Sequence, residues 1–160
     1  MESARGVVMR LSIAVLLALG FVVGCSSPDY GPPSGSTTVD LQVVDGFSLP
    51  MTNRHVRIEG TTATYSSGAR TAHATIETTD VAAIIHELED VEFLDLQPAY
   101  TTCAGEASDA SLTTIEVSLS AGRNTVQHYQ GCSGGIFDKL DHLAVRISEL
   151  SGFTAWLAPE

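Results

Sequence analysis

The chain has 160 residues, of which 44% are hydrophobic and 17% charged, and its formal net charge is −11. This length suits one domain with a hydrophobic core of useful size. An acidic surface repels phosphate backbones, so the composition argues against nucleic acid as a partner.

The first 24 residues are typical of a secretory signal peptide. Arg5 and Arg10 make the start positively charged, and residues 11–23 form an uncharged apolar run. A spanning helix needs about 20 apolar residues, so this run is too short and fits the apolar part of a signal peptide. It ends in Val22-Val23-Gly24-Cys25, which resembles the lipobox of bacterial lipoproteins.

The lipobox resemblance implies cleavage before Cys25 and a thioether-linked diacylglycerol on its sulfur. Two acyl chains attach a protein stably, so the membrane would be a partner without a membrane-binding surface on the folded domain. Ser26 follows the lipidated residue. In a cell with two membranes, that implies the outer membrane, on its periplasmic face or at the surface. The alternatives are an ordinary signal peptide with an incidental cysteine and an uncleaved anchor.

Residues 25–38 are predicted to be the lipidated cysteine and a flexible tether. Pro, Gly and Ser dominate this stretch, which has too few apolar side chains to fold. Fully extended, it would reach about 40 Å. Residues 39–160 are then expected to form a single domain.

The mature chain is more acidic than the precursor. Without residues 1–24 it keeps 18 of 19 acidic residues and 6 of 8 Lys and Arg residues, for a formal net charge of −12. We expect this acidity to keep the protein soluble and non-adhesive. The alternative is electrostatic steering of a basic partner.

Alternating apolar residues predict four strands in the first half of the domain. Val39, Leu41 and Val43 alternate with polar residues, and residues 54–59 alternate with Val56 and Ile58 inward. This period of two is that of a half-buried strand. Residues 62–65 and 70–78 are the third and fourth strand candidates. The short turns between them indicate hairpins.

The apolar period then changes to that of an amphipathic helix. Thr79 or Asp80 is the expected N-cap. The apolar stripe recurs at i, i+3, i+4, i+7 and i+10 through Val81, Ile84, Ile85, Leu88 and Val91. A short apolar segment, residues 93–96, follows and stops before Pro98.

The second half predicts another hairpin and another helix. Residues 113–119 and 124–129 are its strands, and Gly152 is expected to end the helix that follows. Trp156 is expected to pack on the domain. The element order β-β-β-β-α-β-β-α predicts an α+β fold, with a mainly antiparallel sheet of hairpins and two amphipathic helices on one face.

Cys103 and Cys132 are predicted to form a disulfide. They are the two cysteines that lipidation leaves, and disulfides persist in exported proteins. A metal-ligand pair or redox couple is the alternative, although no CxxC spacing is present. The bond would order the loop of residues 100–110. That ordering stabilises a small secreted domain, and it is also how inhibitors prepare a binding loop.

Residues 56–156 resemble a family of bacterial lipoprotein and envelope domains whose function is unassigned. The resemblance rests on the order of several motifs. These are Val56-x-Ile58-x-Gly60, Thr64-Tyr65, Phe93-Leu-Asp-Leu96, Tyr100, Asp109, Val126-x-His128-Tyr129-x-Gly131-Cys132 and Trp156. Where members often carry a cysteine-containing GxCPxY-like stretch, this chain has Met51-Thr-Asn-Arg54. The resemblance implies an α+β fold and an envelope location, and it transfers no site residue.

His128 is the strongest candidate for chemistry. It could serve as a ligand or base near Asp109, or be a histidine satisfied inside the fold, which we favour. Asp138 and His142 lie four residues apart on the second helix and could share a metal, but a solvated helix face explains them, and Asp141 beside them, equally well. The acidic residues Glu87, Glu89, Asp90 and Glu92 lack the pattern of a Ca²⁺ loop and are interpreted as a solvated face.

The sequence contains no nucleophile elbow, P-loop, dinucleotide fingerprint or His-Glu-x-x-His motif. We therefore expect no catalytic residue, no cofactor and no resident metal. The first hypothesis is a membrane-anchored, non-catalytic envelope module that binds an envelope protein or has a structural role. A tethered protease or glycosidase inhibitor is the alternative, and an enzyme is a third.

Overall fold

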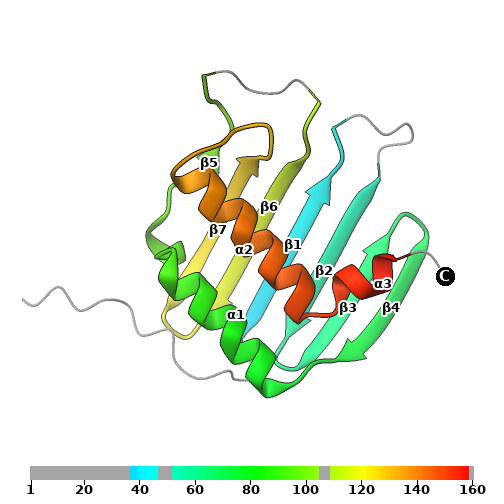
Figure 1. Cartoon of the computed structure of the whole chain (residues 1–160). Helices are drawn as coiled ribbons and strands as arrows, with labels where there is room; N and C mark the ends of the chain where they lie inside the picture. Colours follow the sequence, from blue (N-terminus) through cyan, green and yellow to red (C-terminus); the bar gives the residue numbers. More distant parts are fainter. Residues whose placement is uncertain (1–36, 47–51, 105–108, 159–160) are drawn as a thin grey trace, which may run out of the picture.

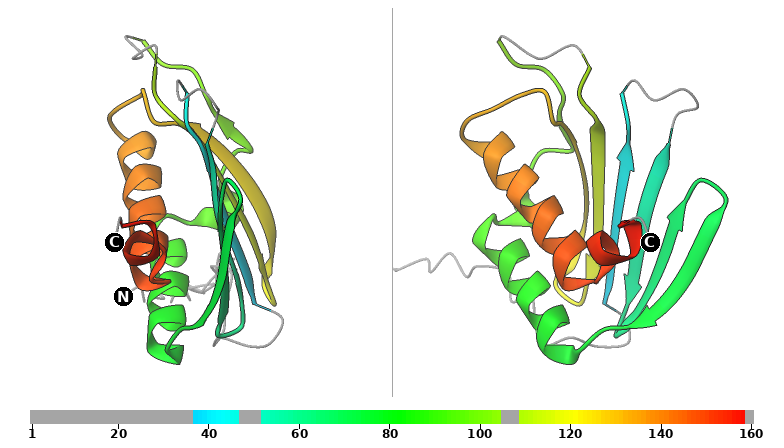
Figure 2. Two further views of the ribbon diagram at one scale, coloured as in Figure 1. Left: turned by 90° about the vertical axis from the view of Figure 1, so that its right-hand side faces the viewer. Right: turned by 45° about the vertical axis from the view of Figure 1, so that its right-hand side comes forward.

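The computed structural model describes residues 37–46, 52–104 and 109–158. They form a seven-stranded sheet with its helices on one face, so the predicted α+β fold is confirmed (Figure 1 and Figure 2). The predicted signal peptide, Cys25 and nearly all of the tether lie outside the described residues. The elements are β1 (Thr38–Val44), β2 (Asn53–Glu59), β3 (Thr62–Ser67), β4 (Arg70–Thr75), α1 (Thr78–Asp90), η1 (Phe93–Asp95), β5 (Ala99–Tyr100), β6 (Leu112–Leu119), β7 (Gly122–Tyr129), α2 (Ile136–Leu150) and α3 (Phe153–Leu157).

The strand order is β4-β3-β2-β1-β6-β7-β5, which places the first strand at the centre of the sheet. β1 pairs antiparallel with both β2 and β6. The hairpins β2–β3–β4 and β6–β7 extend the sheet to either side. The edge strand β5 is the exception, because it pairs parallel with β7.

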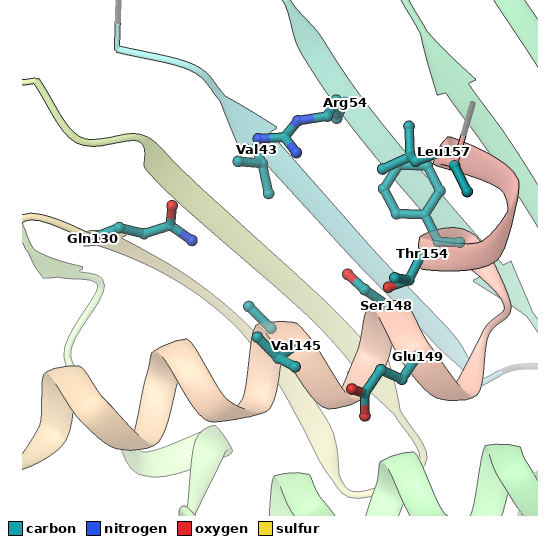
Figure 3. Close-up of a pocket in the computed structure, with 11 residues that line it drawn as sticks. Val43, Arg54, Gln130, Val145, Ser148, Glu149, Thr154 and Leu157 are labelled. Carbon is teal, nitrogen blue, oxygen red and sulfur yellow. The ribbon is translucent and has the colours of Figure 1, made fainter.

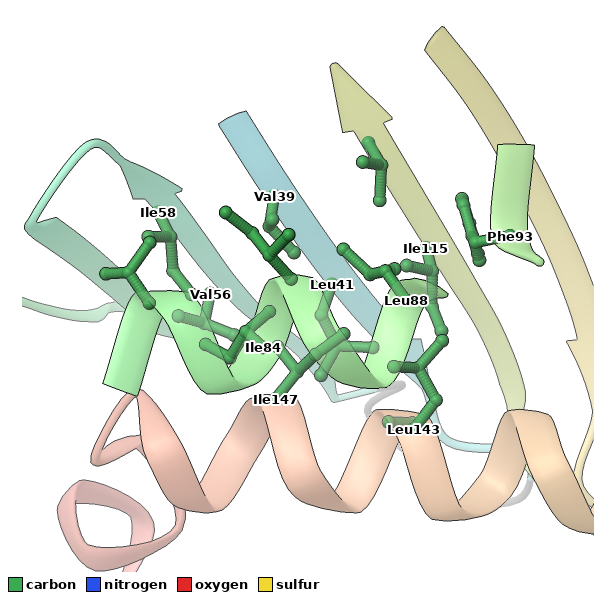
Figure 4. Close-up of a cluster of buried hydrophobic side chains, with 14 of the residues drawn as sticks. Val39, Leu41, Val56, Ile58, Ile84, Leu88, Phe93, Ile115, Leu143 and Ile147 are labelled. Carbon is green, nitrogen blue, oxygen red and sulfur yellow. The ribbon is translucent and has the colours of Figure 1, made fainter. Parts of the chain in front are cut away.

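The core lies between the sheet and the two longer helices (Figure 4). Along β6 the inward residues Thr113, Ile115, Val117 and Leu119 are buried, as a period of two requires. The helices meet them with stripes at helical spacing. These buried residues are Val81, Ile84, Ile85 and Leu88 on α1, and Leu140, Leu143, Ala144 and Ile147 on α2.

The opposite face of the sheet is polar. Its strands present hydroxyl groups and charged side chains, some paired across strands. Asp40 on β1, for example, lies 2.8 Å from His55 Nε2 and accepts a hydrogen bond from Arg57 Nη1 on β2. An antiparallel sheet can leave one face to solvent in this way.

The sheet has two distinct ends, which we call the base and the distal end. The base holds Thr37, whose carbonyl accepts a 3.0 Å hydrogen bond from Gly60 N in the β2–β3 turn. The β6–β7 turn lies at the same end, since Thr38 pairs with Ser118. The distal end holds the far termini of β1 and β6 and the residues after β7 (Figure 1).

α3 closes the domain through three aromatic rings. Phe153 and Trp156 lie with ring centroids 5.7 Å and 5.6 Å from Tyr65 on β3. The Tyr65 hydroxyl donates to the Ser151 carbonyl. Gly152 makes the turn at φ +79°, where a Cβ would also approach the Tyr65 hydroxyl to 3.3 Å. The expectations that Gly152 ends α2 and that Trp156 packs on the domain are confirmed.

Several boundaries and short elements differ from the prediction. The fourth strand ends at Thr75 rather than residue 78, because the chain leaves the sheet to begin α1 at Thr78. Thr79 and Asp80 lie inside the first turn and are not the cap. The extended residue Glu77 is the N-cap, and its carbonyl accepts the first helical hydrogen bonds. β5, η1 and α3 were not predicted.

Candidate functional site

A groove of about 550 Å³ lies between α2, α3 and the distal half of the sheet (Figure 3). We call it the distal groove. Residues of β1 and β2 line one side and residues of α2 and α3 the other. Its apolar lining is Val43, Ala144, Val145, Phe153, Leu157 and Ala158. Its polar lining is Arg54, Gln130, Ser148, Glu149 and Thr154.

The groove is the part of the helix-covered face that the two long helices do not cover. α1 packs beside α2 and covers the part of that sheet face on the other side of α2 from the groove. Val145 on α2 therefore points toward the groove with no helix over it, and it is 52% exposed. Among the described residues, Val145 is the one large hydrophobic side chain that is exposed.

Arg54 supplies the positive charge of the groove. Its Nη2 donates to Asp45, which also accepts a 3.3 Å hydrogen bond from Ser111 Oγ. Asp45, which directly follows the distal end of β1, thereby holds the guanidinium in place. Its Nε is buried and has no hydrogen-bond partner in the described part of the chain.

Glu149 is the acidic residue of the lining, and its charge is balanced outside the groove. Its carboxylate accepts a 2.8 Å hydrogen bond from Arg146 Nη1. Arg146 Nε also donates to Glu87 on α1 at 3.1 Å. These carboxylates favour the charged guanidinium and raise the pKa of Arg146.

His128 lies inside the core rather than at a surface site. Its side chain is 0% exposed, on the same face of β7 as Val126, as the alternation predicted. Its Nε2 lies 2.8 Å from Asp141 on α2, so the ring donates to that carboxylate. Burial lowers the pKa of His128, and the bond to Asp141 offsets part of that effect. The expectation that His128 lies beside Asp109 is therefore wrong, because its partner is Asp141.

Three buried side-chain atoms lack a hydrogen-bond partner among the described residues, and all fall in one cross-strand row. They are Arg54 Nε, Thr113 Oγ1 and His128 Nδ1. The register pairs Arg54 with Val43, Val43 with Thr113, and Thr113 with His128. Buried polar groups almost always have a partner, so this row stands out from the rest of the core. Of the three residues, Arg54 lines the groove.

The other sequence candidates are dispersed. Asp138 accepts a 2.8 Å hydrogen bond from Gly134 N ahead of α2, and His142 Nε2 lies 3.7 Å from Glu87. Glu89 and Asp90 lie near His86 on their own helix. Within residues 37–46, 52–104 and 109–158, no group of three or more His, Cys, Asp or Glu side chains could hold a metal ion.

The predicted disulfide is present at the distal end. Cys103, which follows β5, is bonded to Cys132, which follows β7. Farther along the loop, Ala110 N donates to the Tyr129 hydroxyl at 3.2 Å. Residues 105–108 of this loop lie outside the described part.

The sequence reasoning missed Arg54, although a signal existed. Arg54 has the same parity on β2 as Val56 and Ile58, which were predicted to point inward. A charged residue in an inward position indicates either a buried ion pair or a site. The groove itself depends on how the helices sit on the sheet, which periodicity does not report.

The fold and groove define an α+β domain with one polar sheet face, one helix-covered face and an amphipathic groove at its distal end. A comparison with family models finds no match, and a comparison with curated proteins finds none either. In the described part of the chain, no helix is both long and apolar enough to cross a membrane.

Proposed function

We propose that this protein is a lipid-anchored lipoprotein of the bacterial cell envelope that acts as a non-catalytic binding module. The sequence ending in Val22-Val23-Gly24-Cys25 supports the anchor. The distal groove supports binding, because small-molecule and side-chain sites are concave, mostly apolar and carry a few polar groups.

One observation carries the proposal: the domain begins at the end of the sheet opposite its groove and disulfide. Thr37 lies at the base, whereas Val43, Gln130 and Cys132 lie toward the distal end. A tether that joins the base to a lipidated Cys25 leaves the distal end free to meet a partner. The module then needs the membrane only as a place of attachment.

The surroundings of His128 argue against its use as a catalytic base. Its ring is enclosed by the core, one nitrogen is engaged by Asp141, and no substrate can reach it without opening the fold. A general base must lie within hydrogen-bond reach of the proton that it takes. An enzyme that uses His128 would lose turnover on His128→Ala.

Intact mass of the protein extracted from membranes tests the anchor. We expect a chain that begins at acylated Cys25, with Cys103 and Cys132 together two hydrogens lighter than free thiols. Cys25→Ala is the matched variant, and we expect it to remain unacylated and to keep residues 1–24, because the lipobox has lost its cysteine. An unacylated full-length chain with two free thiols in the wild type would overturn the proposal.

A tethered inhibitor of a protease or glycosidase is the second candidate. The observation in its favour is that the segment after β5 is held at two points, by the Cys103–Cys132 bond and by the Ala110–Tyr129 hydrogen bond. Holding a loop in advance lowers the entropic cost of binding. A complex with a hydrolase that forms in oxidant and is lost in reductant would favour this candidate.

A further inference from the structure

We propose that the outer edge of β4 binds an extended segment of a partner protein, which adds antiparallel to the sheet and places an acidic side chain beside Arg70. The inference goes beyond the proposed function, because it concerns an edge of the sheet and not the distal groove. It depends neither on the groove nor on the lipid anchor.

The outer side of β4 presents a row of backbone groups to a further strand. Ile76 N donates to Thr61 O at 2.9 Å, and hydrogen-bonded pairs alternate along an antiparallel ladder, so the even-numbered residues of β4 direct their backbone groups to β3. The odd-numbered residues Thr71, His73 and Thr75 therefore direct theirs outward. Within the described part of the chain, no strand pairs with that side of β4 (Figure 1).

β4 has few of the features by which edge strands avoid a further strand. It contains no proline and no lysine, and its register with β3 runs without a bulge. Ala72 and Ala74, on its helix-covered side, are small and only partly buried. β4 lies beyond α3 at the outer edge of the sheet (Figure 2). The opposite edge strand, β5, has only two residues, so β4 is the edge that offers a ladder of useful length.

The charge of this edge favours an acidic partner. Residues 60–76 include no Asp or Glu, although the chain has 19 acidic residues. In the described part of the chain, carboxylates pair with Arg54, Arg57, Arg123 and Arg146. Arg70 has no such pair there: its guanidinium lies 4.9 Å from the centroid of the Trp156 ring and donates to the Trp156 carbonyl at 3.4 Å. A carboxylate that reaches Arg70 therefore displaces no existing ion pair.

The register gives the pattern of the incoming segment. The antiparallel neighbours of Ala74, Ala72 and Arg70 are alternate residues of that segment, and they lie on the helix-covered face. Side chains approach most closely in these non-hydrogen-bonded pairs. The segment should therefore read apolar, apolar and acidic at every second position. The β4 strand of a second copy does not fit this pattern, because it carries no acidic residue.

Four peptides with blocked ends test the inference. The parent is Thr-Val-Thr-Val-Thr-Glu, and in the second peptide Gln replaces Glu. The other two carry one N-methyl group each. One is on the central Thr, whose N–H would face β4 opposite His73, and the other is on the second Val, whose N–H would point away opposite Ala72.

Labelled peptides are titrated into the protein purified from cells and held in phosphatidylcholine nanodiscs, with fluorescence anisotropy as the readout and empty nanodiscs as the control for partition. We expect saturable binding of the parent and slower hydrogen exchange over residues 69–76. The N-methyl group on Thr should abolish binding, and the one on Val should change it little. Gln in place of Glu should weaken binding about fourfold, as expected for an exposed ion pair.

Two protein variants assign the charged contact. Arg70→Gln should weaken the parent peptide about fourfold and leave the Gln peptide unchanged. Arg123→Gln is the matched control, because it changes the net charge equally and the Arg123 side chain is 68% exposed on β7, on the other side of the sheet centre. We expect its affinity for the parent to equal that of the wild type.

Several outcomes would overturn the inference. The absence of saturable binding at millimolar parent peptide would remove the site, and equal effects of the two N-methyl groups would exclude the ladder. Equal weakening by Arg70→Gln and Arg123→Gln would point to overall charge. Tighter binding by Arg70→Gln would mean that Arg70 protects the edge. A dimer whose residues 69–76 exchange slowly without peptide would assign the edge to a second copy. The intact mass is measured separately, so a failed edge and a failed anchor are distinguished.

Discussion

His128 is kept neutral by the core, and this makes the stability of the fold depend on pH. Burial holds the pKa of the folded state below the ordinary value of 6.5. Between those two values the unfolded chain binds a proton that the folded chain does not. The contribution of His128 to the free energy of unfolding is therefore constant above pH 6.5. It falls as the pH is lowered from 6.5 toward the pKa of the folded state.

Urea denaturation at pH 7.5 and 5.5 measures this contribution. We expect His128→Leu to be less stable than the wild type at pH 7.5 but to lose less stability between the two pH values, because it has no imidazole to protonate. His73→Gln, on the polar face of β4, is the control and should keep the wild-type loss. An unchanged loss in His128→Leu would contradict the prediction.

For single residues, the sequence predicted on which face of a strand a side chain lies better than which side chain it contacts. Alternation along β7 placed His128 and Val126 on one face, which the structure confirms. Its partner Asp141 comes from a helix that packs over β7, and nothing in the local pattern specifies that contact. Arg54 shows the same limit, since its inward parity was readable but its bond to Asp45 was not.

At the scale of elements, the Cys103–Cys132 bond should contribute strongly to stability. It links the end of β5 to the end of β7 across a sequence separation of 29 residues. In the chain-entropy model, closing a loop of that length stabilises the fold by about 3–4 kcal/mol. Cys103→Ser combined with Cys132→Ser should therefore lower the free energy of unfolding by about 3 kcal/mol.

Chemical denaturation of the double variant beside the wild type, with and without reductant, measures that change. Reductant should destabilise the wild type and leave the double variant unchanged. A wild type indifferent to reductant, with its thiols shown to be free, would mean that the bond contributes nothing.

The elements found from sequence were those with a long period of their own. β6 and α2 repeat their apolar side chains over eight and fifteen residues. β5 has two residues and exists because Ala99 and Tyr100 pair with Gln127 and His128. α3 has five residues and is held by the aromatic contact with Tyr65. Such short elements are made by tertiary contacts, so local periodicity does not report them.

For the whole molecule, the hairpin order predicted one antiparallel sheet with both long helices on one face. It did not predict that β1 lies at the centre and pairs with β6, more than 60 residues away. That pairing joins the two hairpin groups into one sheet. It also sets the base and the distal end, because β1 runs from Thr37 toward the groove.

This polarity predicts how the anchored domain stands relative to the membrane. Ala121, in the β6–β7 turn, lies at the base, whereas Ala69, in the β3–β4 turn, lies toward the distal end, and both are exposed. The eight residues of β6 separate the two ends by about 25 Å at 3.3 Å per residue. A tether joined to the base must therefore keep Ala121 closer to the bilayer on average than Ala69.

Fluorophores on Ala121→Cys and Ala69→Cys, quenched by nitroxide-labelled lipids, compare the two ends in the acylated protein. We expect stronger quenching at position 121, because the tether limits its distance from the surface and leaves position 69 free to point away. Deleting residues 30–35 should raise the quenching at position 121 more than at position 69. Equal quenching at both positions, with the protein bound, would mean that the domain lies flat on the membrane, and the distal end would then not be presented to a partner.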